Sequence, residues 1–201
     1  GDGNHFYLSS HYELDKSGSL NNAIGITPKE NLTLTPDAKL SIFDGKLSLE
    51  SQVTLSAYTR DLNSTEIPLN GTGIPSFLSS LMQPRQSSRV NYAGQATANF
   101  RLDEFGMQVG YERIQPGFIS LGTGRIQDDM RKITISPSAR FLDNKVSIQS
   151  NVSFGRDNLL NSRIQTQRNT GISANVQVQA TDMITISSNY NLLLNSFTTN
   201  S

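Results

Sequence analysis

The residue types that most often carry chemistry in proteins are scarce in this chain. His5 and His11 are its only histidines, and both lie in a segment whose alternating pattern is typical of a strand. Their spacing puts them on one face but roughly 20 Å apart, so one metal ion cannot bind both. A serine hydrolase would need one of them as its base, and no G-x-S-x-G motif occurs. The chain has no cysteine, which excludes disulfides and thiolate metal sites. We therefore expect no catalysis, no cofactor and no metal site.

Three short motifs could bind a ligand, but each has a simpler interpretation. NGTGIP at residues 70–75 and GTGR at residues 122–125 contain glycine, but neither joins a strand to a predicted helix as a phosphate-binding loop does. Both are interpreted as ordinary loops. GRDNL at residues 155–159 could form a charged feature through Arg156 and Asp157. The simpler interpretation is a strand that ends in a polar loop.

A set of charged residues falls among the Ser, Thr, Asn and Gln that alternate with apolar residues along the chain. If these polar positions faced the inside of a barrel, the charges would line its lumen. There they could tune permeation, or they could pair with one another inside a plugged barrel, and the sequence leaves both alternatives open. The candidate lumen-lining residues are Lys39, Glu50, Arg101, Glu112 and Arg140.

Strands must position these side chains, because the apolar residues recur with a period of two. In FLDNKVSIQSNVSF, residues 141–154, Val146 and Ile148 alternate with Ser147 and Gln149, as expected for a strand with one buried face. Residues 31–59 repeat the pattern around the dipeptide at 44–45, Asp-Gly, a strong signal for a type I′ hairpin turn. Further hairpins turn near residues 103–104, 143–144 and 181–182.

Together with an earlier strand in HFYLSSHYELD, these hairpins predict about nine strands in an all-β, antiparallel up-and-down meander. Helix is essentially absent, apart from a short helical turn expected within residues 74–82. Two hairpins, TPDAKLSIFDGKLSLESQVTLS and SPSARFLDNKVSIQSNVSF, resemble copies of one unit. Each carries a proline in its first arm, Pro36 or Pro137, and since proline is confined to strand edges, starts and bulges, we expect bulges there.

The alternation fits either a soluble sandwich or a membrane barrel, and strand length favours the barrel. The predicted arms hold about 11–14 residues, whereas globular strands usually hold ~5–6 and crossing a bilayer takes about 9–11. The turns at one end are about two residues long, while long loops are expected at about 61–89, 115–131 and 158–168. Short turns at one end and long loops at the other are typical of outer-membrane barrels.

Aromatic residues are expected near both ends of the arms, which fits the two interfacial belts of a membrane barrel. One predicted belt lies near the short turns and the other toward the long loops. The first contains Phe43, Phe100, Phe105 and Phe141, and the second Tyr58, Tyr111, Phe118, Phe154 and Phe197.

The composition restricts the class of protein further. Only 17% of the 201 residues are charged, against roughly 25% in ordinary soluble domains. Lys plus Arg and Asp plus Glu are equal, at 17 each, so we expect no basic field that would attract nucleic acid or an anionic membrane surface. No apolar run approaches the ~18–20 residues of a membrane-spanning helix. The start of the chain shows no signal peptide pattern, so we expect a segment of a mature protein.

The chain also resembles the C-terminal barrel region of large, mostly uncharacterised outer-membrane β-barrel proteins of Bacteroidota-type bacteria. The resemblance covers most of residues 31–197. Its segments are YERIQPGFISLG, ITISPSARFLDNKVSIQSNVSFGRDNL and GISANVQVQAT, and the SLG and GRDNL motifs within them are the most specific. The resemblance implies a location and an architecture, and it carries over no catalytic or ligand residues.

From the residues and the resemblance we expect a single β-barrel domain, or a segment of a larger barrel, across residues 1–201 in the bacterial outer membrane. Its partners would be outer-membrane lipid and other envelope proteins, and not nucleic acid. The expected role is porin-like transport, secretion or envelope structure. The alternative is a soluble, surface-exposed β-sandwich that acts as a binding or adhesion module.

Overall fold

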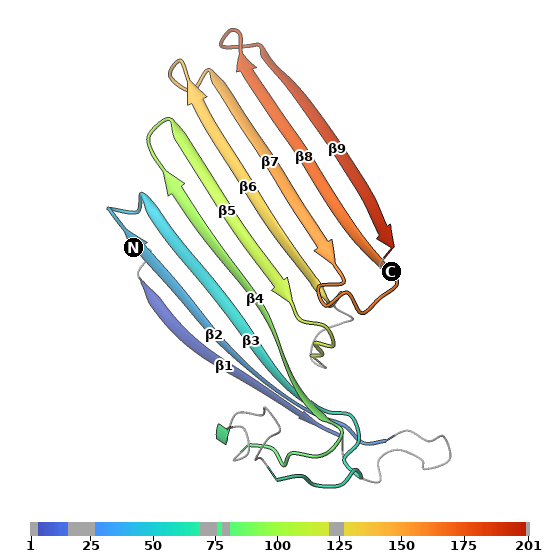
Figure 1. The fold of residues 1–201 in the computed structure, drawn as a ribbon. Helices are drawn as coiled ribbons and strands as arrows, with labels where there is room; N and C mark the ends of the chain where they lie inside the picture. Colours follow the sequence, from blue (N-terminus) through green and yellow to red (C-terminus); the bar gives the residue numbers. More distant parts are fainter. Residues whose placement is uncertain (1–3, 16–26, 69–75, 78–80, 121–126, 200–201) are drawn as a thin grey trace.

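The fold is one sheet of nine antiparallel strands, seen in a computed structural model (Figure 1). The structure describes residues 4–15, 27–68, 76–77, 81–120 and 127–199. Each strand pairs with the next in the chain, in the order β1 to β9, so the predicted all-β up-and-down meander is confirmed. The strands are β1 His5–Leu14, β2 Glu30–Ile42, β3 Leu47–Thr59, β4 Ser88–Arg101, β5 Phe105–Ile114, β6 Met130–Phe141, β7 Val146–Asp157, β8 Gln165–Gln179 and β9 Thr185–Thr199.

The connections differ in length at the two ends of the sheet. Residues 43–46, 102–104, 142–145 and 180–184 join strands at one end, and residues 15–29, 60–87, 115–129 and 158–164 join them at the other. Of the short helical turn expected within 74–82, residues 76–77 form part of a 3₁₀ turn, and most of the remainder lies outside the described residues. The glycine stretches at 70–75 and 122–125 lie entirely outside the described residues.

The two hairpins that resemble copies in sequence share one turn geometry. In the first, Asp44 and Gly45 have φ angles of 54° and 81°, and in the second, Asp143 and Asn144 have φ angles of 54° and 69°. Positive φ at both central residues is what a type I′ turn requires, and Gly, Asn and Asp tolerate it best. In each turn the lysine that follows donates its N–H to the carbonyl three residues earlier, at 3.0 Å. The Asp-Gly and Asp-Asn turn predictions are confirmed.

The predicted bulges at the two prolines are wrong. Pro36 pairs with Leu8, Pro137 pairs with Met107, and the register of β2 and β6 continues unshifted on both sides of each proline. The ladders to β3 and β7 skip only the proline and the residue before it. Each proline therefore removes one ladder hydrogen bond toward the next strand, but no extra residue is inserted, so no bulge forms.

The register divides the sheet into two chemically distinct faces. We call the face that holds Leu40, Leu49 and Ile148 the apolar face, and the face that holds Lys39, Glu50 and Gln149 the polar face. Directly paired residues lie on the same face, so the apolar face comprises the even-numbered residues of β1, β2, β4, β7, β8 and β9 and the odd-numbered residues of β3, β5 and β6. One period-two pattern thus extends coherently over nine strands.

No second layer covers the apolar face of the described residues. In mid-sheet Val109 of β5 is 41% exposed and its partner Ile135 of β6 is 36% exposed, whereas a sandwich would bury such side chains between two sheets. The buried apolar side chains are few and lie toward the long-loop end: Leu32, Ala57, Tyr58, Met82, Ile114 and Phe118. The described residues therefore form one sheet, and none of them supplies the second sheet of a sandwich.

At the long-loop end, loops cover both faces of the sheet. Met82, from the loop after β3, packs on Leu32 and Ala57 of the apolar face. On the polar face Asn31 donates to Ser56 at 2.9 Å, and the Ser56 hydroxyl donates to the Ile119 carbonyl in the loop after β5. The uncovered part of the apolar face therefore lies between these loops and the short turns.

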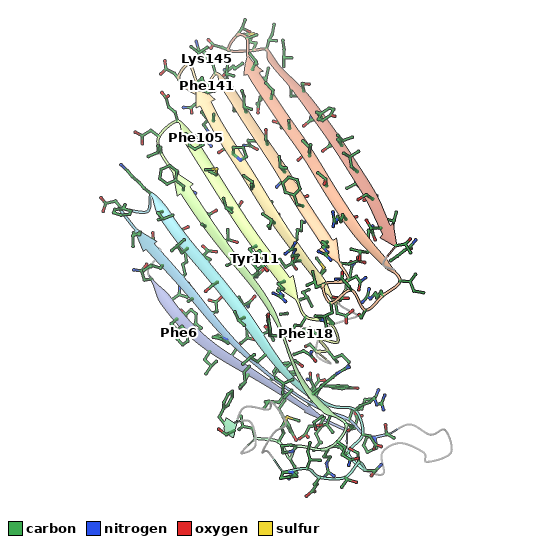
Figure 2. All side chains as sticks on the ribbon, in the orientation of Figure 1. Phe6, Phe105, Tyr111, Phe118, Phe141 and Lys145 are labelled. Carbon is green, nitrogen blue, oxygen red and sulfur yellow. The ribbon has the colours of Figure 1, made fainter. Side chains whose placement is uncertain are left out.

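The aromatic residues match one predicted belt better than the other. Near the short turns Phe100, Phe105 and Phe141 lie on the apolar face and are 39–46% exposed. Figure 2 labels Phe105 and Phe141 at this end of the sheet. Of the second predicted belt, only Tyr111 and Phe154 lie exposed on that face.

The other three residues of the second belt lie elsewhere. Tyr58 is on the polar face and buried, with the Arg89 guanidinium 5.3 Å from its ring centroid. Phe118 is buried in the loop after β5, and Phe197 lies on the polar face. Loop packing and strand parity, rather than distance from a turn, decided these positions.

Candidate functional site

The polar face carries all five of the charged residues predicted to line a lumen. Lys39, Glu50, Arg101, Glu112 and Arg140 share this face across β2 to β6. The structure brings two of them together, because Lys39 pairs directly with Glu50 and its Nζ lies 3.0 Å from Oε1. The other three make no ion pair within the described residues.

Amide and hydroxyl side chains link neighbouring strands between these charges. Asn175 donates to Asn189 at 2.5 Å and Asn151 to Ser136 at 2.8 Å. Gln95 donates to Gln52 at 3.1 Å. These groups satisfy one another along the ladder and still have free lone pairs and N–H groups for water. The polar face can therefore form hydrogen bonds with water through these neutral groups.

The sheet is hollowed on this polar face. A depression of about 530 Å³ extends from β4 to β9. Polar side chains from successive strands border it, and among them are Asn99, Gln108, Ser136, Gln149, Asn175 and Asn191. A depression that spans this many adjacent strands means that the sheet is concave toward its polar side, as the inner wall of a barrel would be.

The histidines each have an acidic neighbour but form no larger cluster. His5 Nε2 lies 3.3 Å from Asp37 Oδ1, and His11 Nε2 lies 2.9 Å from Glu13 Oε1. No group of three or more His, Asp or Glu residues in the described ranges could hold a metal ion.

The GRDNL motif ends in a hydrogen-bonded loop at the long-loop end. Asn158 is fully buried with φ 51°. Its amide donates to the carbonyls of Arg163 and Gln165 and to the Thr166 hydroxyl, at 2.9–3.1 Å. Its own oxygen accepts the Arg163 N–H at 2.9 Å. The motif therefore ends in a polar loop, as the simpler interpretation of the sequence predicted, and the hydrogen bonds of Asn158 hold this loop together.

Asp129 anchors the same loop from the adjacent connection. It is 1% exposed, accepts the Leu159 N–H at 2.7 Å, and lies 3.5 Å from the Arg163 guanidinium. Its φ of 60° is a conformation that Asp and Asn adopt more readily than other side chains. Sequence reasoning did not identify Asp129 or the central role of Asn158, because a lone Asp or Asn in a polar loop gives no specific signal.

Among the described residues, no helix has both the length and the apolar character needed to span a membrane. Comparison of the chain with protein-family models, with curated proteins and with solved structures gave no match.

Proposed function

We propose that this chain forms part of the wall of a bacterial outer-membrane β-barrel, with its apolar face on lipid and its polar face on the lumen. Its role is transport, secretion or envelope structure, without catalysis. The observation that carries this proposal is the uncovered apolar face of a single, long-stranded sheet. The resemblance to Bacteroidota-type barrel proteins points the same way.

The size of the apolar face supports a lipid environment. Nine strands have eight gaps of about 4.8 Å, and an apolar band about 20 Å long across them covers on the order of 800 Å². The largest apolar patch on a typical soluble monomer is about 300–600 Å². In water an apolar face of this size would favour association with other chains, whereas in a bilayer it would lie against the lipid chains.

The height of the band fits a bilayer as well. On β7 the apolar positions run from Val146 to Phe154, about 27 Å along the strand at ~3.4 Å per residue. At a tilt of about 40° this corresponds to about 21 Å, near the ~25 Å apolar band of known outer-membrane barrels. Arg156 follows on the same face, where the headgroup region would begin.

The open edges of the sheet favour a larger barrel. β9 has 15 residues with neither charge nor proline, and its outer edge has no partner among the described strands. Soluble proteins protect such an edge with charges, prolines or bulges, whereas barrel closure removes it. We propose that β1 and β9 pair with further strands to close the wall.

A pair of adjacent cysteines tests the proposed facing. The chain has no cysteine, so Ile148→Cys on the apolar face and Gln149→Cys on the polar face can each carry one fluorophore in the intact protein. Nitroxide-bearing lipid should quench the label at 148 much more strongly than the label at 149. Equal quenching at both sites, or recovery of the protein from envelopes without detergent, would overturn the proposal in favour of a soluble binding or adhesion module.

A further inference from the structure

Four arginines stand side by side in one cross-strand row on the apolar face. Arg113 of β5 pairs directly with Arg131 of β6, Arg131 with Arg156 of β7, and Arg156 with Arg168 of β8. We call these four residues the arginine row. It lies toward the long-loop end, and the next row toward the short turns is Tyr111, Ile133, Phe154 and Thr170.

Such a row needs a negative partner. Cβ atoms of directly opposed residues lie about 4.5–5.5 Å apart, and like charges at that distance destabilise a sheet. No ion pair to a carboxylate involves the arginine row within the described part of the chain. The nearby Asp128 and Asp129 both pair with Arg163 instead.

Two members of the row have buried polar atoms without a partner. Arg113 Nε and Arg156 Nε are shielded from solvent and make no hydrogen bond in the described structure. The remaining contacts of the row that the structure shows are with neutral groups: the Arg113 guanidinium lies 5.9 Å from the centroid of the Tyr92 ring, and Arg156 donates to Asn161 Oδ1 at 2.8 Å. Buried hydrogen-bond donors normally have an acceptor, so the two unpaired Nε–H groups indicate that a ligand supplies the acceptor.

A hollow next to the row combines cationic and apolar walls. It measures about 340 Å³, and Arg131, Arg156 and Arg168 border it together with Ile133 and Phe154. Guanidinium groups bind phosphate in a bidentate manner, while the apolar walls continue into the uncovered face below. The ligand that this hollow fits has an anionic head and an apolar body.

We propose that the arginine row binds the phosphate groups of an anionic membrane lipid, in the leaflet next to the long loops. This inference rests on the proposed function, because it places the apolar face in lipid. A nucleic acid fits less well, since the row spans three strand gaps, about 14 Å, and ends in an apolar surface. An acidic protein segment would leave the apolar part of the hollow unfilled.

Lipid binding by the detergent-solubilised intact protein tests the proposal. The probe is fluorescent phosphatidic acid, with fluorescent phosphatidylcholine as the zwitterionic comparison. We expect saturable binding of phosphatidic acid only. In the triple variant Arg131→Gln/Arg156→Gln/Arg168→Gln the affinity should fall by at least about tenfold, since each basic residue near a lipid surface contributes about 1 kcal/mol.

Arginines on the polar face supply the matched control. Arg101→Gln/Arg140→Gln removes two positive charges elsewhere on the sheet and should leave the affinity within about twofold of wild type, because both side chains lie on the opposite face. If the triple variant does not fold, Arg168→Gln alone should still weaken binding by about fivefold. Arg168 makes no side-chain hydrogen bond or ion pair in the described structure, so this change should not disturb folding.

Several results would overturn the inference. Unchanged affinity in the row variants would do so, as would equal binding of phosphatidylcholine. Displacement of the lipid by inorganic phosphate, polyglutamate or a single-stranded oligonucleotide as readily as by unlabelled phosphatidic acid would assign the row to a soluble anion, an acidic protein or a nucleic acid. The quenching experiment at residues 148 and 149 tests the proposed function independently of lipid binding. If the label at 148 is quenched by lipid but the protein shows no preference for phosphatidic acid, the proposed function stands and only this inference is refuted.

Discussion

A charge placed on the apolar face near mid-strand should discriminate lipid from water as the medium against that face. Val152 lies on the apolar face of β7, paired with Ile135 and Ile172. It is two residues from Ser150, the middle of the apolar band on this strand, which is about 7 Å along the strand and about 5 Å in depth after tilt. Val152→Arg therefore brings a guanidinium close to the bilayer midplane.

The expected loss can be estimated from this depth. An arginine on the lipid face of a barrel costs about 2–4 kcal/mol at the midplane and about 0–1 kcal/mol near the interfaces. At about 5 Å from the middle we expect a loss of about 2 kcal/mol in the free energy of unfolding. Denaturant titration of the intact protein in lipid vesicles measures it. In an aqueous setting the same substitution at this partly exposed position would cost about 0.5 kcal/mol or less.

The adjacent residue is the control. Ser153 lies on the polar face, so Ser153→Arg should change the free energy of unfolding by less than about 0.5 kcal/mol. Equal, small effects of Val152→Arg and Ser153→Arg would refute a lipid-facing apolar side. A large effect of Ser153→Arg alone would show that the assignment of the two faces is reversed.

Three further predictions concern the loops, the turns and the polar face. Asn158→Ala should destabilise the loop at 158–164 by about 3 kcal/mol, because it leaves several buried groups unpaired and puts alanine at positive φ; hydrogen exchange measures this, and unchanged protection of that loop would contradict it. Gly45→Val should cost about 1–2 kcal/mol because φ there is 81°, whereas Asn144→Gly should be neutral or slightly stabilising; equal changes in the free energy of unfolding for the two variants would rule out the shared turn geometry. Lys39 and Glu50 should show a coupling energy below about 1 kcal/mol in a double-mutant cycle, since both side chains are partly exposed. A coupling of several kcal/mol would mean that this ion pair is buried by a plug.

Local rules made the architecture predictable from the sequence. Period-two alternation requires strands with two unlike faces, and it placed Lys39 and Glu112 on one face although they lie on different strands. Asp-Gly and Asp-Asn adopt positive φ at low cost, so the hairpin turns could be located. These are properties of neighbouring residues, and a single chain displays them directly.

The tertiary structure decided which residues meet across strands and what the loops cover. Arg113, Arg131, Arg156 and Arg168 are spread over 56 positions of the sequence, and only the register of three successive strand pairs aligns them. Tyr58 and Phe118 were expected to face lipid but are buried, because loops fold over the long-loop end. Alternation fixes the face on which a side chain lies, and a tight turn fixes the register of its own hairpin. The register across a long loop, as between Arg113 and Arg131, and the packing of the loops depend on long-range interactions that no local pattern encodes.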